Sequence, residues 1–155
     1  MNYIVIFFAK YVVFVLPLIV AIVFLVIEKK EKIAFLKFSV IMAPVSYALA
    51  YVAGYLWYNP RPFVVEQIVP LIYHVNDNGF PSGHTLFAGV FAMSLFFVHR
   101  KTSIALLVLT IIIGVSRVVA DVHHLMDIVG SILIVVIGAL IAYSFDRRLF
   151  KARLS

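Results

Sequence analysis

The sequence predicts an all-α, polytopic membrane protein with a single domain over residues 1–155. Of these 155 residues, 65% are hydrophobic and only 13% are charged, and the mean hydropathy is +1.12. A soluble domain of this size could not cover so much apolar surface. Because a membrane-spanning helix needs about 20 apolar residues, the chain has room for five or six spans and little else. We expect about five transmembrane helices in one bundle.

The distribution of charge favours a membrane protein over one that binds nucleic acid. The formal net charge is +6, but the lysines and arginines stand at the ends of apolar segments and not along one helix face. Basic residues at such ends indicate membrane topology. The sequence contains no cysteine, which excludes disulfides, thiolate chemistry and cysteine-ligated zinc or iron–sulfur sites.

The first expected span covers residues 3–27 and has a kink at Pro17. Its apolar run is longer than the core of a signal peptide and ends without a small-residue cleavage site, so we expect no cleaved leader. Lys10 lies inside this span, where a long side chain can reach the nearer membrane interface.

A helix break and a long connection follow the second span. This span comes after a short, mainly basic loop at residues 28–32 and runs from about residue 33 or 38 to residue 57. The prolines of Asn59-Pro60-Arg61-Pro62 then end the helix. Residues 63–80 form the longest connection, and we expect its apolar first half to lie along the membrane surface or to cover the site.

Three further spans are expected at residues 83–98, 103–120 and 125–145, separated by a basic turn and a brief polar break. This arrangement places ten of the thirteen lysines and arginines on one side: Lys29, Lys30, Lys32, Lys37, Arg100, Lys101, Arg147, Arg148, Lys151 and Arg153. The positive-inside rule makes that side cytoplasmic. The N-terminus is then outside, and Arg61 and Arg117 lie near the outer face.

Three polar segments meet at that outer face. They are Arg61-Pro62 after the second span, Pro81-Ser82-Gly83-His84 at the start of the third, and Ser116-Arg117 with His123 and Asp127 between the fourth and fifth. Charged residues at membrane depth are costly and are usually functional or paired. We therefore interpret the three segments as parts of one site.

The residue types in these segments suit the handling of a phosphate. Asp127 follows His123 by four residues, so on a helix the two share a face and the carboxylate can accept the histidine Nδ1–H. The Nε2 lone pair is then free to act as nucleophile or base. Arg61 and Arg117 offer bidentate donors for phosphate oxygens.

The second segment adds an anion-binding helix start. Ser82 is a good N-cap, which places Gly83 and His84 in the first turn, where free N–H groups and the helix dipole favour an anion. Glycine permits close approach of a ligand. A protonated His84 can give its proton to a leaving oxygen.

A metal centre is the competing interpretation of the same residues. His84, His123, His124 and Asp127 have side chains that zinc accepts as ligands. Two arginines beside them would repel a cation, so we expect neither a metal ion nor another cofactor.

Taken together, the three segments resemble the signature motifs of the type 2 phosphatidic acid phosphatase (PAP2) family. The resemblance runs from residue 54 to residue 127, and the second and third motifs match at every fixed position. It implies a metal-independent phosphatase or diphosphatase that acts through a phosphohistidine. By position, the implied catalytic residues are His123 as nucleophile, Asp127 as its orienting partner and His84 as general acid. The implied phosphate-binding residues are Arg61, Ser82, Gly83 and Arg117.

One position departs from the family pattern. The first motif begins with a lysine seven residues before the arginine, and this chain has Gly54 there. Our hypothesis is that Lys10, the unusual charge of the first span, turns toward the site and replaces the missing lysine.

The resemblance also implies a substrate class. Arg61-Pro62-Phe63 followed by Asp77-Asn78-Gly79-Phe80-Pro81 is similar to small bacterial members that act on undecaprenyl diphosphate. We therefore expect a lipid substrate from the bilayer and a site on the extracytoplasmic side of a bacterial plasma (inner) membrane. The alternatives are a glycerophospholipid phosphatase for phosphatidic acid or phosphatidylglycerol phosphate, and a catalytically inactive member that binds headgroups. The sequence does not indicate an oligomeric state.

Overall fold

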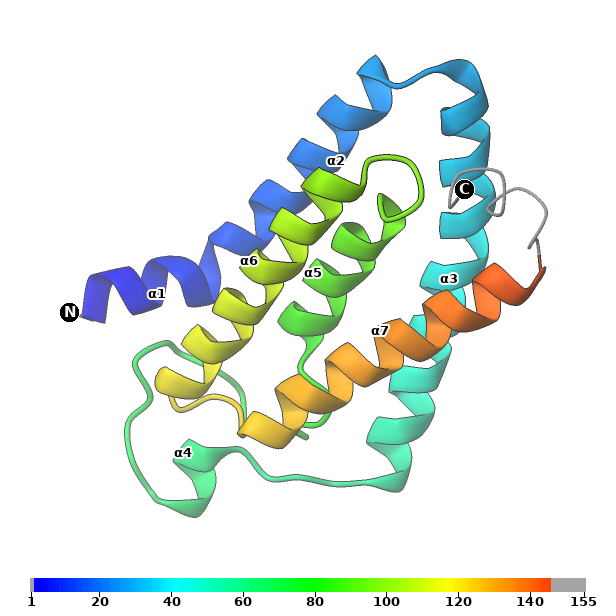
Figure 1. Ribbon diagram of the computed structural model, residues 1–155. Coiled ribbons are helices and arrows are strands. Elements are labelled where there is room, and N and C mark those ends of the chain that lie inside the picture. Colours follow the sequence, from blue (N-terminus) through cyan, green and yellow to red (C-terminus); the bar gives the residue numbers. More distant parts are fainter. Residues whose placement is uncertain (1, 146–155) are drawn as a thin grey trace.

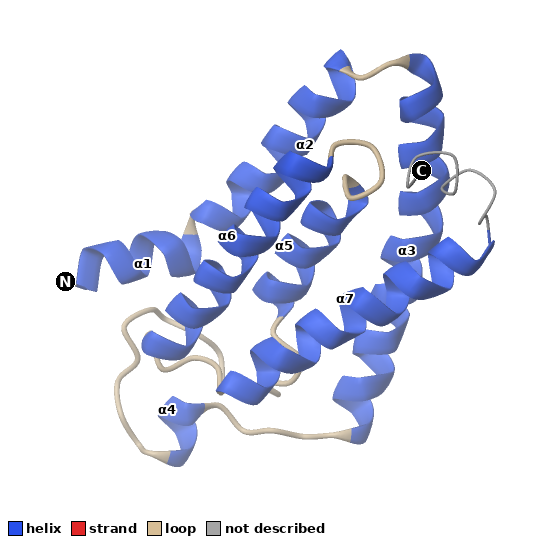
Figure 2. Cartoon of the chain, in the orientation of Figure 1, coloured by secondary structure: helices blue, strands red, loops and turns tan. Residues whose placement is uncertain are grey.

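The computed structural model describes residues 2–145, and within that range the chain is helical with no strands (Figure 2). This confirms the predicted all-α class. The elements in chain order are α1 Asn2–Lys10, the 3₁₀ helix η1 Val12–Phe14, α2 Val15–Val26, α3 Lys29–Leu56, α4 Pro62–Val65, α5 Gly83–Ser94, α6 Arg100–Val119 and α7 Leu125–Phe145.

The first apolar segment is broken ahead of its proline. Instead of one kinked helix, α1 ends at Lys10 and the chain passes through η1 before α2 begins. The reason is Pro17, because a proline has no N–H and its ring clashes with the carbonyl four residues earlier, here that of Val13. The α-helical pattern is therefore lost over the residues before Pro17. Figure 1 shows α1 leaning away from the direction of α2.

The basic segment at residues 28–32 is not the loop that the sequence analysis expected. It is the start of α3, with Glu28 as the N-cap and a capping box in which Glu28 and Glu31 accept each other's backbone N–H groups. Two helix-terminal N–H groups are satisfied in this way. The sequence analysis took the alternating charges of this segment for a loop and did not recognise Glu28 and Glu31 as a helix-capping pair.

The expected number of five spans is not confirmed. In the described part of the chain, four helical segments are long and apolar enough to cross a membrane: residues 2–26, 29–56, 100–119 and 125–145. Helix α5 has 12 residues, which corresponds to about 18 Å, against a hydrocarbon core of about 30 Å. Its apolar sequence continues to Val98, but residues 95–98 form turns, and hydropathy does not distinguish a buried turn from a helix.

The short helix α5 lies in the centre of the bundle. It packs against α6, α7, α3 and α2, while α3 and α7 pack against each other. In Figure 1, α5 is enclosed between α6 and α7. The contact between α3 and α7 depends on Gly138, because a Cβ there would overlap Ser46 Oγ. Gly138 therefore permits the close packing of these two helices.

The long connection between α3 and α5 closes one end of the bundle. At this end α3 stops, α5 starts, α6 stops and α7 starts (Figure 1). Ile72 is buried together with Ala9, Ala120 and Val122, and the Leu71 N–H donates to Ala120 O at 3.2 Å. The end of the apolar first half of the connection is therefore held against α1 and the turn between α6 and α7. Of the two positions expected for this apolar half, covering the site describes Leu71 and Ile72, which line the cavity described below.

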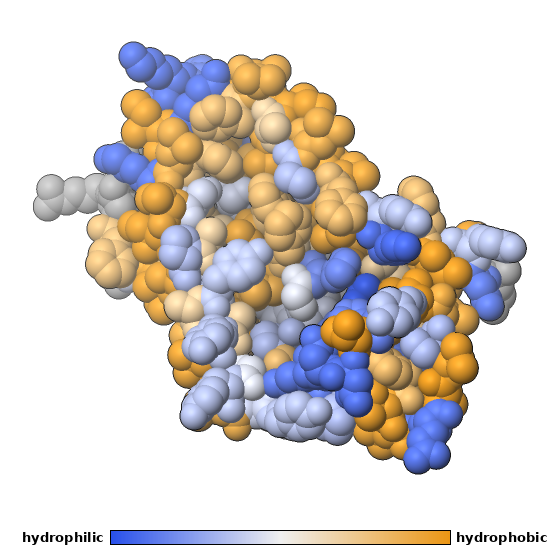
Figure 3. Space-filling model, turned by 180° about the vertical axis from the view of Figure 1, so that it is seen from behind, coloured by the Kyte–Doolittle hydropathy of each residue, from blue (hydrophilic) through white to orange (hydrophobic). Residues whose placement is uncertain are grey.

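The surface of the bundle is mostly apolar, as expected for helices in contact with lipid. Figure 3 shows hydrophilic side chains gathered in the lower half of the view and framed by hydrophobic ones, with a further hydrophilic group near the opposite end. The lower group lies at the end that the long connection closes.

Candidate active site

The three polar segments of the sequence meet at one end of the bundle. Arg61 stands just before α4, Ser82 and Gly83 at the start of α5, and Arg117 near the end of α6. His123 and Asp127 flank the start of α7. The common site that the sequence predicts is thus formed by chain ends of three different helices and one connection.

His123 and Asp127 form a buried pair. His123 Nδ1 lies 3.2 Å from Asp127 Oδ2, and the two side chains are 2% and 0% exposed. His123 precedes α7 instead of lying within it, so the turn before the helix, and not a shared helix face, brings the two together. The predicted contact is present for a different geometric reason.

The contact that Nε2 of His123 makes determines which of the two ring nitrogens carries the proton. Arg61 Nη1 lies 3.2 Å from His123 Nε2, and an arginine can only donate. Nε2 must therefore be the acceptor, which puts the proton on Nδ1, where Asp127 accepts it. This is the tautomer that a nucleophilic Nε2 needs.

Asp127 accepts two further hydrogen bonds. Asn59 Nδ2 donates to Oδ1 at 2.7 Å, and the His124 N–H donates to Oδ2 at 2.8 Å. The carboxylate is thus surrounded by donors, which favours its ionised form. Sequence reasoning missed Asn59, although it stands in the helix break that was singled out. Gly79 is also required here, because a Cβ would sit 3.0 Å from Asp127 Oδ2 and 3.1 Å from Asn59 O.

Arg61 is anchored by protein acceptors. Its side chain is 5% exposed, with Nε donating to Asp77 Oδ1 at 2.7 Å and Nη1 to Val122 O at 2.6 Å. These bonds orient the guanidinium against His123. The sequence analysis named Asp77 only as part of the segment that resembles small bacterial members, and not as a partner of Arg61.

Arg117 differs from Arg61 because it has unpartnered donors. It is 2% exposed, and Nη1 donates to Ala9 O at 3.1 Å. Nε and Nη2 have no hydrogen-bond partner within residues 2–145. A buried guanidinium with two unsatisfied nitrogens is costly unless a ligand supplies the acceptors. An anion at this position would do so.

The start of α5 has the expected boundaries but not the expected cap. Ser82 is the N-cap residue, yet its side chain makes no capping hydrogen bond. Instead its hydroxyl accepts from Thr85 Oγ1 at 3.1 Å, and the residue is fully buried. At Gly83, a Cβ would meet nothing within 4 Å, so the first turn of α5 faces open space. The amides of this turn and the Ser82 O–H, which the bond from Thr85 leaves free to donate, are available to an anion.

A cavity of about 560 Å³ opens beside these groups, within the usual range for ligand pockets. Its wall contains His84 and Arg117 from the predicted set. It also contains His74 from the long connection and Lys10 from the end of α1. The His74 ring lies 6.2 Å from that of His123. Lys10 was singled out in the sequence as the unusual charge of the first span, and only the fold brings it and His74 to one cavity.

The electrostatics of the site keep His123 neutral. Burial lowers the pKa of His123, and the charges of Arg61 and Arg117 act in the same direction, against the opposing hydrogen bond to Asp127. The pKa of His74 is also lowered, first by burial and then by Arg61. A neutral imidazole is the form that can attack or accept a proton.

The four residues named for a metal site are not grouped as ligands of one ion in the part of the chain that the structure describes. Within residues 2–145, no group of three or more His, Asp or Glu side chains is arranged to hold a metal ion. His124 Nε2 lies 3.1 Å from Pro60 O, which accounts for this histidine as a hydrogen-bonded neighbour of the site.

Gly54, where the family lysine is absent, is closely covered by the connection. A Cβ at this position would lie 3.0 Å from Phe80 O, and Gly54 O accepts from Asn78 Nδ2 at 2.7 Å. A larger residue would have to displace the backbone just before Pro81. The close contact gives a physical reason for a glycine here.

Comparisons with known proteins identify the family. The PAP2 superfamily model matches residues 33–151. The bacitracin transport permease protein BcrC of Bacillus licheniformis is 31% identical over 144 residues, which is 92% of this chain and 70% of that protein. The putative undecaprenyl-diphosphatase YbjG of Escherichia coli K12 is 33% identical over 138 residues, 88% of this chain and 69% of that protein.

A second Bacillus protein and a solved structure agree with these matches. The undecaprenyl-diphosphatase BcrC of Bacillus subtilis strain 168 is 30% identical over 96 residues, 62% of this chain and 50% of that protein. The crystal structure of LpxE from Aquifex aeolicus has a similar fold, with a TM-score of 0.73 and 24% identity over 92% of this chain and 85% of that one. The chain therefore belongs to the PAP2 superfamily and is an integral membrane phosphatase of that family.

Proposed function

We propose that this protein removes the terminal phosphate of a lipid diphosphate, undecaprenyl diphosphate in particular, through a phosphohistidine on His123. The observation that carries the proposal is the buried His123–Asp127 pair, with its Nε2 facing Arg61, beside a cavity lined by His84 and Arg117. The names of the relatives from B. subtilis and E. coli support undecaprenyl diphosphate as the substrate.

In the first step, His123 Nε2 attacks the terminal phosphorus of the substrate. The N–P bond forms as the bridging P–O bond breaks, and the leaving oxygen takes the proton of His84. Burial lowers the pKa of His84 to about 4 in the empty site, and the bound diphosphate raises this pKa because a nearby anion favours the protonated ring. The lipid monophosphate is thereby released. Asp127 holds the Nδ1–H of His123 and stabilises the positive charge that develops on the ring.

In the second step, water attacks the phosphorus of the phosphohistidine. His84, now neutral, accepts the proton of that water, and the N–P bond breaks with its electron pair returning to His123. Inorganic phosphate leaves, and both histidines regain their starting protonation. Each proton that His84 gives in the first step is recovered in the second.

The negative oxygens of the reacting phosphate need donors that are already in place. Nε and Nη2 of Arg117 are buried and unpartnered, so they gain acceptors when the phosphate binds. The amides at Gly83 and His84 open the first turn of α5 and supply neutral donors. Arg61 contributes from the side of His123, where it is already fixed by Asp77. The Ser82 hydroxyl accepts from Thr85, which leaves its own O–H free to donate to a phosphate oxygen.

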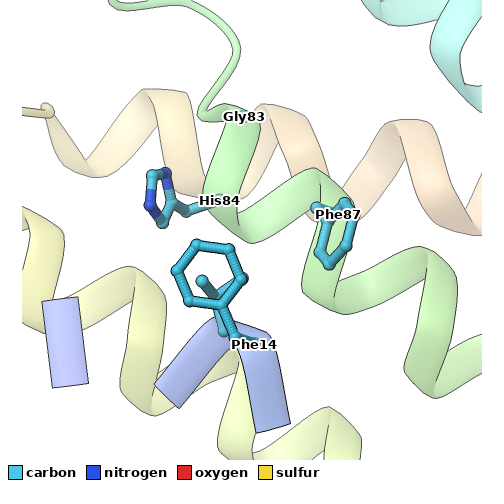
Figure 4. A pocket seen from close by; sticks show the side chains of 5 residues that line it. Phe14, Gly83, His84 and Phe87 are labelled. Atoms are coloured by element: carbon cyan, nitrogen blue, oxygen red, sulfur yellow. The ribbon is translucent and has the colours of Figure 1, made fainter. Parts of the chain in front are cut away.

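The lipid chain has an apolar path next to the headgroup. A second cavity of about 230 Å³ is lined by Val13, Phe14, Gly83, His84 and Phe87. Figure 4 shows the Phe14 ring lying between His84 and Phe87, beside the first turns of α5. His84 and Phe14 line both cavities. A lipid can therefore place its phosphates in the polar cavity and the start of its chain over Phe14.

The basic residues support a site on the extracytoplasmic side of a bacterial plasma membrane. Lys29, Lys30 and Lys32 lie at the start of α3 and Arg100 at the start of α6, at the end of the bundle away from the site (Figure 1). The positive-inside rule makes that end cytoplasmic. The basic residues expected at 147–153 lie outside the described range.

Phosphate release from purified protein in detergent tests this function. We would compare undecaprenyl diphosphate, phosphatidic acid and phosphatidylglycerol phosphate, with EDTA present and with His123→Ala as the control. The expected result is preferential hydrolysis of the diphosphate that survives EDTA and is lost in the variant. Preference for either glycerophospholipid would assign the alternative substrate class, and no hydrolysis of any lipid would favour a headgroup-binding role.

A further inference from the structure

Two basic side chains in the 560 Å³ cavity, a lysine and a histidine, have no part in the mechanism above. Lys10 and His74 line the same wall as His84 and Arg117. Lys10 lies outside the segment matched by the family model, which begins at residue 33, and His74 lies in the connection between the first two motifs. The cavity therefore offers more hydrogen-bond donors for an anion than the reacting phosphate needs.

The fold places Lys10 at this cavity through its neighbour in the chain. Ala9 is fully buried, and its carbonyl accepts a hydrogen bond from Arg117 Nη1 at 3.1 Å. Helix α1 packs against α6 and ends at Lys10. The last residue of α1 is thus fixed next to the arginine that has unpartnered donors, while the Lys10 side chain itself is exposed.

His74 is positioned by the packing of the residues before it. Ile72 is buried against Ala9, Ala120 and Val122, so the connection is attached to the same end of α1. His74 has an exposed side-chain fraction of 22%, and its Nδ1 lies 3.8 Å from Asp77 Oδ1. Because Asp77 also holds Arg61, one carboxylate links His74 to the group beside His123.

We propose that Lys10 and His74 form a second phosphate subsite, which holds the lipid-linked phosphate of a diphosphate while His123 attacks the terminal one. This inference rests on the proposed function, and it attributes the preference for diphosphates over monophosphates to these two residues. The terminal phosphate lies between His123, Arg61 and Arg117. The second phosphate lies in the adjoining cavity, where Lys10 and His74 donate to its oxygens and His84 reaches the bridging oxygen. The lipid chain then continues over Phe14, which lines both cavities.

The charge balance supports this division. The side chains that line the cavity include Lys10, His74, His84 and Arg117 and no carboxylate within the described range. A diphosphate carries more negative charge than a monophosphate ester, and a partly buried site strengthens each charge–charge contact. Binding of the second phosphate also favours protonation of His74, because a nearby anion raises a histidine pKa. The subsite therefore selects diphosphates over monophosphates.

A matched pair of substrates tests the subsite. We would measure kcat/KM of wild type, Lys10→Met and His74→Gln with farnesyl diphosphate and farnesyl monophosphate, which share one chain. Each variant should lower kcat/KM for the diphosphate by about tenfold to a hundredfold, the usual effect of losing a charge-assisted hydrogen bond. The same variants should change kcat/KM for the monophosphate by less than about threefold. Lys10→Arg should restore most of the diphosphate activity.

Control variants lie at the opposite end of the bundle. Lys101→Met and His99→Gln remove the same side chains near the start of α6, where both residues are exposed, and they should leave both substrates unaffected. Equal losses on the two substrates in Lys10→Met would overturn the inference, because Lys10 would then hold the attacked phosphate. Unchanged diphosphate activity in both cavity variants would overturn it as well.

Binding separates this inference from the proposed function. Titration calorimetry with inorganic pyrophosphate and inorganic phosphate requires no turnover. Wild type should bind pyrophosphate at least about tenfold more tightly than phosphate, and Lys10→Met should reduce that ratio. If the protein hydrolyses neither farnesyl substrate but keeps this pattern, the proposed function fails and the subsite stands. A ratio that Lys10→Met leaves unchanged contradicts the subsite, whatever the activity.

Discussion

Hydrogen bonding at the site determines which nitrogen of His123 carries its proton. Asp127 Oδ2 lies at Nδ1 and Arg61 Nη1 at Nε2, so the lone pair points toward the arginine and away from the carboxylate. A substrate phosphate can take over the contact with Arg61 and receive the Nε2 attack without a change of tautomer. The residue types in the motifs predicted this pair, but its orientation depends on Val122 and Asp77, which no motif contains.

Replacing Asp127 with asparagine should leave the fold intact and remove most of the activity. All three groups that reach this carboxylate are donors: His123 Nδ1–H, Asn59 Nδ2–H and the His124 N–H. Whichever way the asparagine amide is turned, its NH₂ group faces a donor. We expect kcat for phosphate release to fall by about 10²–10⁴, with the control Asp121→Asn close to wild type. A kcat within about tenfold of wild type in Asp127→Asn would contradict the role of the pair.

The pH profile should report the lowered pKa of His123. Its neutral form attacks, so kcat/KM falls as the pH drops through this pKa and protonates the ring. Because burial lowers the pKa below the usual 6.5, the acidic half-point of kcat/KM should lie below pH 6.5. A half-point above pH 7 would mean that another group controls the acid side. Measurement of kcat/KM between about pH 4 and 8 would distinguish the two.

Among the elements, the connection between α3 and α5 does more than link two helices. Asn78 is its main attachment, because its side chain accepts from the Asn59 and Phe80 N–H groups and donates to Gly54 O and Trp57 O. The sequence analysis named Asn78 only as part of the segment that resembles small bacterial members. Contacts between residues 19 to 24 positions apart are not visible in local sequence patterns, which is why this role was not predicted.

Asn78→Ala should therefore destabilise the end of the bundle that carries the site. The variant leaves the buried or half-buried groups around residue 78 without partners, and each such group costs about 1–3 kcal/mol. We expect a lower midpoint of thermal inactivation in detergent together with reduced kcat. The matched control is Asn76→Ala, an exposed asparagine in the same turn, which should behave like wild type. Equal behaviour of the two variants would show that the attachment is unimportant.

The helix boundaries show where apolar runs in the sequence predict a helix correctly and where they do not. The apolar runs correctly located α6 and α7 to within a few residues, because these helices are bounded by polar turns. The apolar runs overestimated the length of α5, where residues 95–98 are apolar but form turns that are buried at Leu95 and partly buried beyond it. Leu95 is fully buried, and the Phe97 ring stacks on Tyr143 at 5.4 Å. Tertiary packing, and not helix formation, explains these apolar residues.

At the scale of the whole molecule, two separate ends account for the distribution of charge. One end carries the basic starts of α3 and α6, and the other carries the long connection and the site. Between them the surface is apolar. The sequence predicted this division from the positions of lysines and arginines alone. It did not predict that Lys10 and His74 share a cavity with Arg117, because that depends on how α1 and the connection pack against α6.

Single cysteines can test the sidedness of the two ends, since the chain has none of its own. Tyr73 is 92% exposed at the site end, and Lys29 is exposed at the start of α3. In intact bacterial cells, a membrane-impermeant thiol reagent should label Tyr73→Cys at once and Lys29→Cys only after lysis. The opposite pattern would place the site on the cytoplasmic side.

The central claim is that His123 carries the phosphoryl group, and trapping that intermediate tests it most directly. Purified wild-type protein would be mixed with undecaprenyl diphosphate radiolabelled in its terminal phosphate, quenched in alkaline denaturant and digested for peptide mapping. We predict an acid-labile, alkali-stable label on the peptide that contains His123, and neither label nor turnover in His123→Ala. Label on a different residue, or phosphate release that continues in His123→Ala, would contradict the claim.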